Sequence, residues 1–230
     1  MNYLFLQKNR IFALLFSVAL SSVALADRTA QMLYFKAPKG APESVAIYQT
    51  GKDPVEVELK RNNFSESFEL GSGELVLGFL PSILPEDSEF PKNAPTAKVP
   101  EGWEKVLILA FHDPKNPVMP VRFKVINASS GNLGNGDRMF INFTNSDVFG
   151  LVGRKKLVLK ANATAIVKNA AAPGEEYQVQ IDRIDPVRKK RLTFIRQVWR
   201  QSATRRSLIF IYSPPGSTAV TYYNAPVRDL

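Results

Sequence analysis

Leu107–Phe111 (LILAF) is a run of five apolar residues that leads into the turn residues His112-Asp113-Pro114. A short, continuous apolar run that ends at turn residues indicates a fully apolar β-strand. The segment after the turn mixes polar and apolar residues and predicts a second strand at 118–126. We therefore expect a hairpin of one apolar strand, a proline turn and one half-polar strand.

The same pattern recurs near the C-terminal end of the sequence. Leu208–Tyr212 (LIFIY) is followed by Ser213–Gly216 (SPPG) and by a predicted strand at 219–224. A hairpin of the same kind near the end of each half predicts two similar β domains in tandem. The competing interpretation is that any two β-hairpins resemble each other at this level.

Alternation of polar and apolar residues dominates the rest of the chain. Val121, Phe123 and Val125 alternate with Arg122 and Lys124, as in a strand with one face in water. No segment shows a sustained period of about 3.6 residues with caps at both ends, so no helix is expected. Further strands are expected at 31–36, 44–49, 55–59, 65–70, 74–80, 139–143, 156–160, 163–168, 177–181 and 191–199.

These patterns predict an all-β protein of two small antiparallel β-sandwich domains of immunoglobulin-like type. The most turn-rich stretch is Asn127–Gly136 (NASSGNLGNG), which divides the chain into domains at 27–127 and 128–230. The segment 81–104 contains five prolines and is expected to be a long irregular loop, because proline cannot donate to a strand ladder. Such a loop either carries function or wraps a sheet edge.

Residues 1–26 have the pattern of a secretory signal peptide. Lys8 and Arg10 precede the apolar run Ile11–Leu20, and Ala24-Leu25-Ala26 is a small-residue cleavage site. The apolar run is too short for a transmembrane helix. We expect export to the periplasm, the cell envelope or the medium.

The composition excludes several chemistries. The chain has no cysteine and only one histidine, His112, so a thiol nucleophile, a Cys-ligated metal and a histidine metal cluster are excluded. No G-x-S-x-G, Walker or dinucleotide-binding motif is present. We expect no cofactor, no metal and no catalytic residue.

A cluster of basic residues is the clearest charge feature. The residues after Ala26 carry 28 Lys and Arg against 21 Asp and Glu. The candidate anion-binding patch consists of Arg188, Lys189, Lys190, Arg191, Arg196 and Arg200. On a strand Arg196, Val198 and Arg200 share one face, and such a face beside a basic hairpin tip suits phosphates or acidic glycans. Export argues against nucleic acid as the partner, and the alternative is a solvated edge strand whose charges prevent aggregation.

Two enzyme or membrane alternatives remain open. A glycan hydrolase needs only two carboxylates, and the candidate pairs are Glu66 with Glu69, Glu86 with Glu89, Glu175 with Glu176, and Asp182 with Asp185. An outer-membrane β-barrel is the second alternative, although its strands would need about 9–11 residues.

Val121–Asn145 resembles a pattern in exported β proteins of Gram-negative-type bacteria for which no activity is known. In that pattern a strand, a glycine turn and a strand ending in Asn-x-Ser/Thr precede a strand like Val152–Leu159 (VGRKKLVL), and Leu208–Pro215 is similar too. The resemblance covers about half of the chain after Ala26 and implies a tandem β-sandwich and export. It implies no activity, and no functional residue follows from it.

The function expected from the sequence is therefore an exported, non-catalytic binding or structural protein of the bacterial envelope. Its partner would be an anionic envelope polymer or another envelope protein. The sequence does not predict an oligomeric state.

Overall fold

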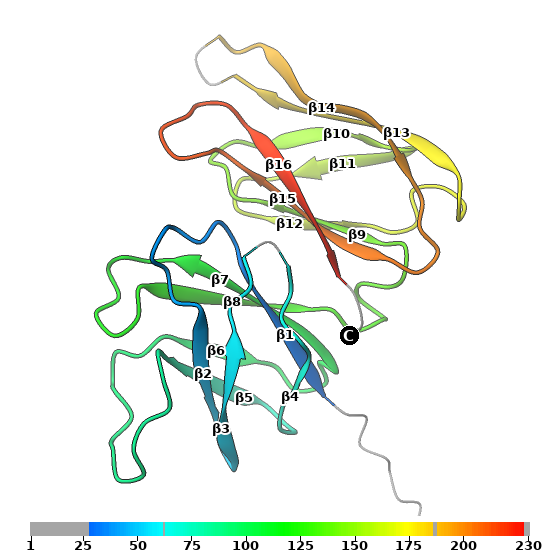
Figure 1. Cartoon of the computed structure of the whole chain (residues 1–230). Helices are drawn as coiled ribbons and strands as arrows, with labels where there is room; N and C mark the ends of the chain where they lie inside the picture. Colours follow the sequence, from blue (N-terminus) through cyan, green and yellow to red (C-terminus); the bar gives the residue numbers. More distant parts are fainter. Residues whose placement is uncertain (1–27, 62, 186–187, 228–230) are drawn as a thin grey trace, which may run out of the picture.

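The computed structural model describes residues 28–61, 63–185 and 188–227 (Figure 1). These residues form sixteen β-strands and no helix, which confirms the all-β prediction. The predicted signal peptide lies outside the described residues. No helix within the described residues is long and apolar enough to cross a membrane.

The strands follow one another along the whole described chain. The first eight are β1 (Thr29–Tyr34), β2 (Ser44–Gln49), β3 (Lys52–Glu58), β4 (Phe68–Glu69), β5 (Leu75–Leu80), β6 (Thr96–Val99), β7 (Lys105–His112) and β8 (Val121–Asn127). The last eight are β9 (Arg138–Asn142), β10 (Val148–Val152), β11 (Lys155–Leu159), β12 (Thr164–Val167), β13 (Glu176–Ile184), β14 (Arg191–Arg200), β15 (Arg206–Tyr212) and β16 (Thr221–Val227).

The strands pair into four sheets of four. Sheet A has the order β4-β1-β7-β8, sheet B β3-β2-β5-β6, sheet C β12-β9-β15-β16 and sheet D β11-β10-β13-β14. Adding eight to each strand number of sheets A and B gives sheets C and D, so the second eight strands repeat the topology of the first eight. Most pairs are antiparallel as expected, but β1 runs parallel to β7 and β9 runs parallel to β15.

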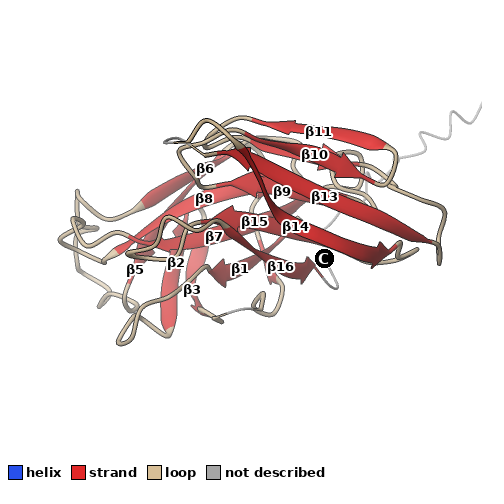
Figure 2. Cartoon of the chain, turned by 90° about the horizontal axis from the view of Figure 1, so that it is seen from above, coloured by secondary structure: helices blue, strands red, loops and turns tan. Residues whose placement is uncertain are grey.

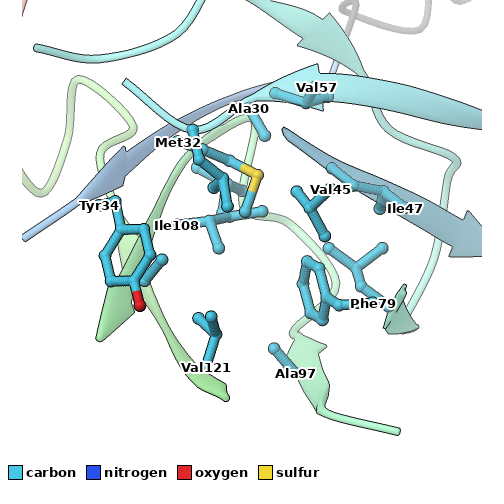
Figure 3. Close-up of a cluster of buried hydrophobic side chains, with 14 of the residues drawn as sticks. Ala30, Met32, Tyr34, Val45, Ile47, Val57, Phe79, Ala97, Ile108 and Val121 are labelled. Carbon is cyan, nitrogen blue, oxygen red and sulfur yellow. The ribbon is translucent and has the colours of Figure 1, made fainter. Parts of the chain in front are cut away.

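The sheets stack in the order B, A, C, D, with an apolar core between each two neighbours (Figure 1). Strand β7 shows why this order is possible. Its residues Val106, Ile108 and Ala110 point into the core between sheets A and B, part of which Figure 3 shows. Leu107 and Leu109 alternate with them and point into the core between sheets A and C.

Strand β15 is the counterpart of β7 in sheet C. Leu208 and Phe210 enter the core shared with sheet A, whereas Ile209 and Ile211 enter the core shared with sheet D. The runs LILAF and LIFIY are fully apolar because each crosses the centre of a sheet that is covered on both faces. Both parallel strand pairs lie in these inner sheets, which agrees with the general burial of parallel strands.

The outer face of sheet B is covered by the segment 81–95. The phenyl ring of Phe90 packs against the ring of Tyr48 with 5.2 Å between the ring centroids, and the Leu84 N–H donates to Tyr48 Oη over 2.6 Å. Gly78 leaves the room for this ring, because a Cβ at that position would lie 2.4 Å from Phe90 Cζ. The proline-rich segment therefore covers a sheet face rather than only an edge.

Two strands were not expected from the sequence. Thr96–Val99 forms β6 within the predicted irregular loop 81–104, where it pairs with β5, so the prediction was wrong for these residues. Val148–Val152 forms β10 although Gly150 interrupts its pattern. A Cβ on Gly150 would lie 1.9 Å from the Gln180 carbonyl oxygen, so glycine permits the close approach of β13.

Candidate anion-binding site

The hairpin of β13 and β14, at one edge of sheet D (Figure 2), carries all six residues of the predicted basic patch. Its tip is closed by backbone hydrogen bonds between Asp185 and Lys190 (2.8 Å) and between Lys189 and Asp185 (2.9 Å). The Asp185 carboxylate also accepts the Arg188 N–H over 3.0 Å. The side chains of Arg188, Lys189 and Lys190 are exposed, so the tip presents three cations to solvent.

A β-bulge decides which side chains of β14 reach the outer face. Ile181 pairs with Ile195, but the next residue, Asp182, pairs with Thr193, so that Phe194 is the extra residue in β14. An extra residue reverses the alternation on one side of the bulge. Thr193 and Arg191 are therefore on the same outer face as Asp182.

Asp182 is a buried carboxylate held entirely by its neighbours on that face. Arg191 Nε and Nη2 lie 2.6 and 2.5 Å from Asp182 Oδ2, and Thr193 Oγ1 donates to Oδ1. Burial alone would raise the pKa of Asp182, but hydrogen bonds from Thr193, Arg191 and Gln180 and the charge of Arg191 more than offset it, so the pKa is lowered. The Arg191 guanidinium also lies over the ring of Phe149 at 4.7 Å.

The six predicted residues therefore fall into two groups. Arg191 is engaged by Asp182, and Arg200 Nε donates to the Gly174 carbonyl over 2.9 Å. Within the described part of the chain, the side chains of the other four are exposed and have no ion-pair partner. These four are Arg188, Lys189, Lys190 and Arg196.

The register of sheet D adds a basic residue that the sequence analysis did not single out. Lys156 of β11 pairs with Leu151, Leu151 with Gln180, and Gln180 with Arg196. Residues paired in this way share one face, so Lys156 and Arg196 lie at opposite ends of one row across the outer face. Both are exposed. Only the strand pairing reveals this row, because the two residues are 40 positions apart in the sequence.

Charge is distributed unevenly between the two repeats. Residues 27–127 carry 12 basic and 14 acidic side chains, whereas residues 128–230 carry 16 basic and 7 acidic ones. The formal net charges are therefore −2 and +9. A field of one sign over one half of a molecule attracts polyanions before specific contacts form.

Two of the four candidate carboxylate pairs of a glycan hydrolase, Glu66 with Glu69 and Asp182 with Asp185, contain carboxylates that are already engaged by basic side chains. Glu69 accepts from Lys52 over 3.4 Å and lines a cavity of about 490 Å³, whose lining residues do not include Glu66. Glu66 instead pairs with Lys60. Asp182 is buried against Arg191, as described above.

The same cavity has Arg28 and Trp103 in its wall, but Arg28 serves the fold. Its guanidinium donates to the carbonyl oxygens of Trp103 (2.8 Å), Gly71 (3.1 Å) and Gly73 (2.5 Å). Burial lowers the pKa of Arg28, and the charge of Glu101 partly offsets this effect. The group thus joins the start of β1 to two loops and has few donors left for a ligand.

Among the described residues, no three His, Cys, Asp or Glu side chains are grouped so that they could hold a metal ion. His112 is exposed at the end of β7. No protein-family model matches this chain, and no curated protein matches it in sequence.

Proposed function

We propose that this chain is an exported, non-catalytic binding protein of the bacterial envelope, built from two immunoglobulin-like β-sandwiches in tandem. The basic β13–β14 hairpin would contact an anionic envelope polymer. The repeated strand order of sheets A and B in sheets C and D supports the tandem architecture. Export rests on the signal-peptide pattern of residues 1–26.

One observation carries the choice of ligand. Four exposed cations, Arg188, Lys189, Lys190 and Arg196, have no carboxylate within ion-pair distance among the described residues. The nearby carboxylate of Asp182 is already neutralised by Arg191 and closed to solvent. An unpaired cation on this hairpin can pair with a sulfate, phosphate or carboxylate of a polymer without first breaking an internal ion pair.

Retention on a heparin column tests this proposal, because binding to a polyanion weakens as salt screens the charges. We expect the triple variant Arg188→Ser, Lys189→Ser, Lys190→Ser to elute at clearly lower salt than the unmodified protein. Arg191 is left intact because its removal would strand the buried Asp182 carboxylate.

The matched control changes three exposed lysines of the first repeat, Lys39→Ser, Lys92→Ser and Lys115→Ser. Both variants lose three positive charges, so a difference between them reports position rather than net charge. Equal elution of the two variants would contradict the hairpin as the binding site.

A further inference from the structure

The exposed large apolar side chains gather at the two ends of the sheet stack. Eight such residues are found among the described residues. Val76 on β5 and Ile83 and Phe90 of the covering segment lie on the outer side of sheet B. The other five belong to sheet D, where Leu151, Val158, Ile184 and Val198 lie on the outer face and Leu192 lies near the hairpin tip. An apolar patch with a polar rim on a water-exposed surface marks an interaction site.

The two ends carry opposite charge. On the outer face of sheet D, called the basic end, Lys156 and Arg196 lie at the two ends of the row that contains Leu151. Val198 follows Arg196 by two residues on β14, and the hairpin tip adds three cations. On the outer side of sheet B with its covering segment 81–95, called the acidic end, Glu86, Asp87 and Glu89 are exposed beside Ile83 and Phe90. Two lysines at the acidic end, Lys92 and Lys98, reduce its charge without cancelling it, because Glu56 of β3 adds a fourth exposed carboxylate.

The repeated topology shows what sheet D lacks. Sheets B and D occupy the same place in the two repeats, and their third and fourth strands are β5 with β6 and β13 with β14. The connection between β5 and β6 is the segment 81–95, which folds back over sheet B. The connection between β13 and β14 is only 185–190, and no described segment covers the outer face of sheet D. The basic end is therefore an exposed sheet face whose counterpart is covered.

We propose that copies of this protein associate head to tail, with the basic end of one copy docked on the acidic end of the next. Leu151, Val158 and Val198 would bury the exposed parts of Ile83 and Phe90, while Lys156 and Arg196 pair with the carboxylates of the covering segment. The two ends lie on opposite sides of the four-sheet stack (Figure 1), so one copy can engage two neighbours at once. Contacts between different surfaces on successive copies do not close a dimer and lead to rings or open chains.

The size of the surfaces sets the expected strength. Strands about 4.8 Å apart and residues about 3.3 Å apart give a face of about 450 Å² for four strands of about seven residues. Stable complexes bury about 800 Å² on each partner, so we expect this association to be weak and to depend on protein concentration. The charge contribution makes the association weaker as salt rises.

Sedimentation velocity of the purified protein over a concentration series tests the proposal. We expect the average mass to rise steadily with concentration at about 0.05 M salt and to rise much less at about 0.5 M salt. The variant Val198→Asp blocks the basic end and the variant Ile83→Asp blocks the acidic end. Because both residues are about half exposed, at 51% and 48%, neither change should disturb the core.

The variants Val198→Asp and Ile83→Asp distinguish head-to-tail association from contact between two like ends. Each alone should lose association by at least tenfold, a change of about 1.4 kcal/mol. A mixture of the two should form a one-to-one dimer and nothing larger, because each variant keeps the end that the other lacks. Self-association of Ile83→Asp alone would indicate contact between two basic ends and would overturn the proposal, as would an unmodified protein that stays monomeric throughout.

A double variant tests whether loss of association could result from local unfolding. Glu86→Lys with Glu89→Lys changes only exposed charges at the acidic end, and it should also abolish association while the thermal unfolding midpoint is unchanged. This variant also separates the two proposals, since it leaves the basic hairpin intact and should not weaken heparin retention. Loss of association with full heparin retention supports head-to-tail docking, whereas unchanged association contradicts it whatever the heparin result.

Discussion

Sheets B and D hold the same place in two repeats of one strand order. Their outer faces nevertheless differ in what stabilises them. On sheet B a segment of the same chain lies over the face and places Phe90 against Tyr48. On sheet D the face stays open, and a buried carboxylate, Asp182, is held by Arg191 and Thr193. The same strand order therefore accommodates either an apolar covering segment or a buried polar cluster on the equivalent face. We call the cluster of Asp182, Arg191 and Thr193 the polar lock.

The difference begins with the connection between the third and fourth strands of each sheet. Fifteen residues separate β5 from β6, enough to cross the sheet, whereas six residues separate β13 from β14 and allow only a tight hairpin. The hairpin leaves β14 as an exposed edge strand of ten residues. Charged side chains on such an edge oppose uncontrolled pairing with other strands.

The largest loss of stability is expected when the polar lock of sheet D is broken. Arg191→Leu leaves the Asp182 carboxylate buried without its cation, and a buried unpaired charge is costly. Because the Arg191 side chain is 58% exposed, water can replace part of the interaction. We expect a loss of about 2–3 kcal/mol in the free energy of unfolding, measured by urea denaturation.

Arg196→Leu is the matched control, since it makes the same substitution on the same strand and face. Arg196 is exposed and has no ion-pair partner among the described residues, so a change within about 0.5 kcal/mol is expected. Equal destabilisation by the two substitutions would mean that Asp182 does not depend on Arg191.

A smaller effect is expected from loosening the cover of sheet B. Phe90→Ala removes a ring that packs on Tyr48 but is 40% exposed, so the expected loss is about 1–2 kcal/mol. Gly78→Ala should also destabilise the protein, because its Cβ would meet the Phe90 ring at 2.4 Å. In the Phe90→Ala background the second change should cost much less, and a double-mutant cycle measures this coupling. Additive effects would show that the ring does not rest on Gly78.

The inner sheets were the part of the fold that the sequence predicted best. Leu107–Phe111 and Leu208–Tyr212 were expected to begin hairpins, and β7 with β8 and β15 with β16 form them. Strands close to β1 and β9 were also predicted, but their parallel pairing with β7 and β15 was not, because an apolar run indicates burial but carries no information on which strand lies beside it. Pairing across about 75 residues depends on the packing of the whole stack.

The polar lock on sheet D could not be read from the sequence for a different reason. Strict alternation from Ile195 would place Thr193 and Arg191 on the inner face, away from Asp182. The bulge at Phe194 places both residues on the outer face instead, and no residue pattern around Phe194 predicts a bulge. The basic patch was visible as a run of charges, but its division into engaged and unpaired cations required the register.

The last expected effect is a change in pH dependence rather than in stability at neutral pH. The folded-state pKa of Asp182 is lowered below the ordinary value of 3.8, because hydrogen bonds from Thr193, Arg191 and Gln180 and the Arg191 charge outweigh the effect of burial. As pH falls through about 3.8, the unfolded chain takes up a proton at this residue before the folded protein does. The stability that this carboxylate contributes is therefore complete above that pH and is lost progressively below it, down to the lowered folded-state pKa.

Asp182→Asn removes this titration while it keeps the size of the side chain and an oxygen that can accept from Thr193. We expect urea midpoints measured from pH 7 down to pH 2.5 to fall less steeply for the variant than for the unmodified protein. Asp147→Asn is the comparison on an exposed site, where the hydrogen bond from Lys160 lowers the pKa but solvent surrounds both groups. If the buried carboxylate stabilises the outer face of sheet D, Asp182→Asn must change the fall of the urea midpoint at acid pH (the acid limb) more than Asp147→Asn does. If the two variants alter the acid limb equally, the contacts of Asp182 contribute no more to stability than a surface ion pair does.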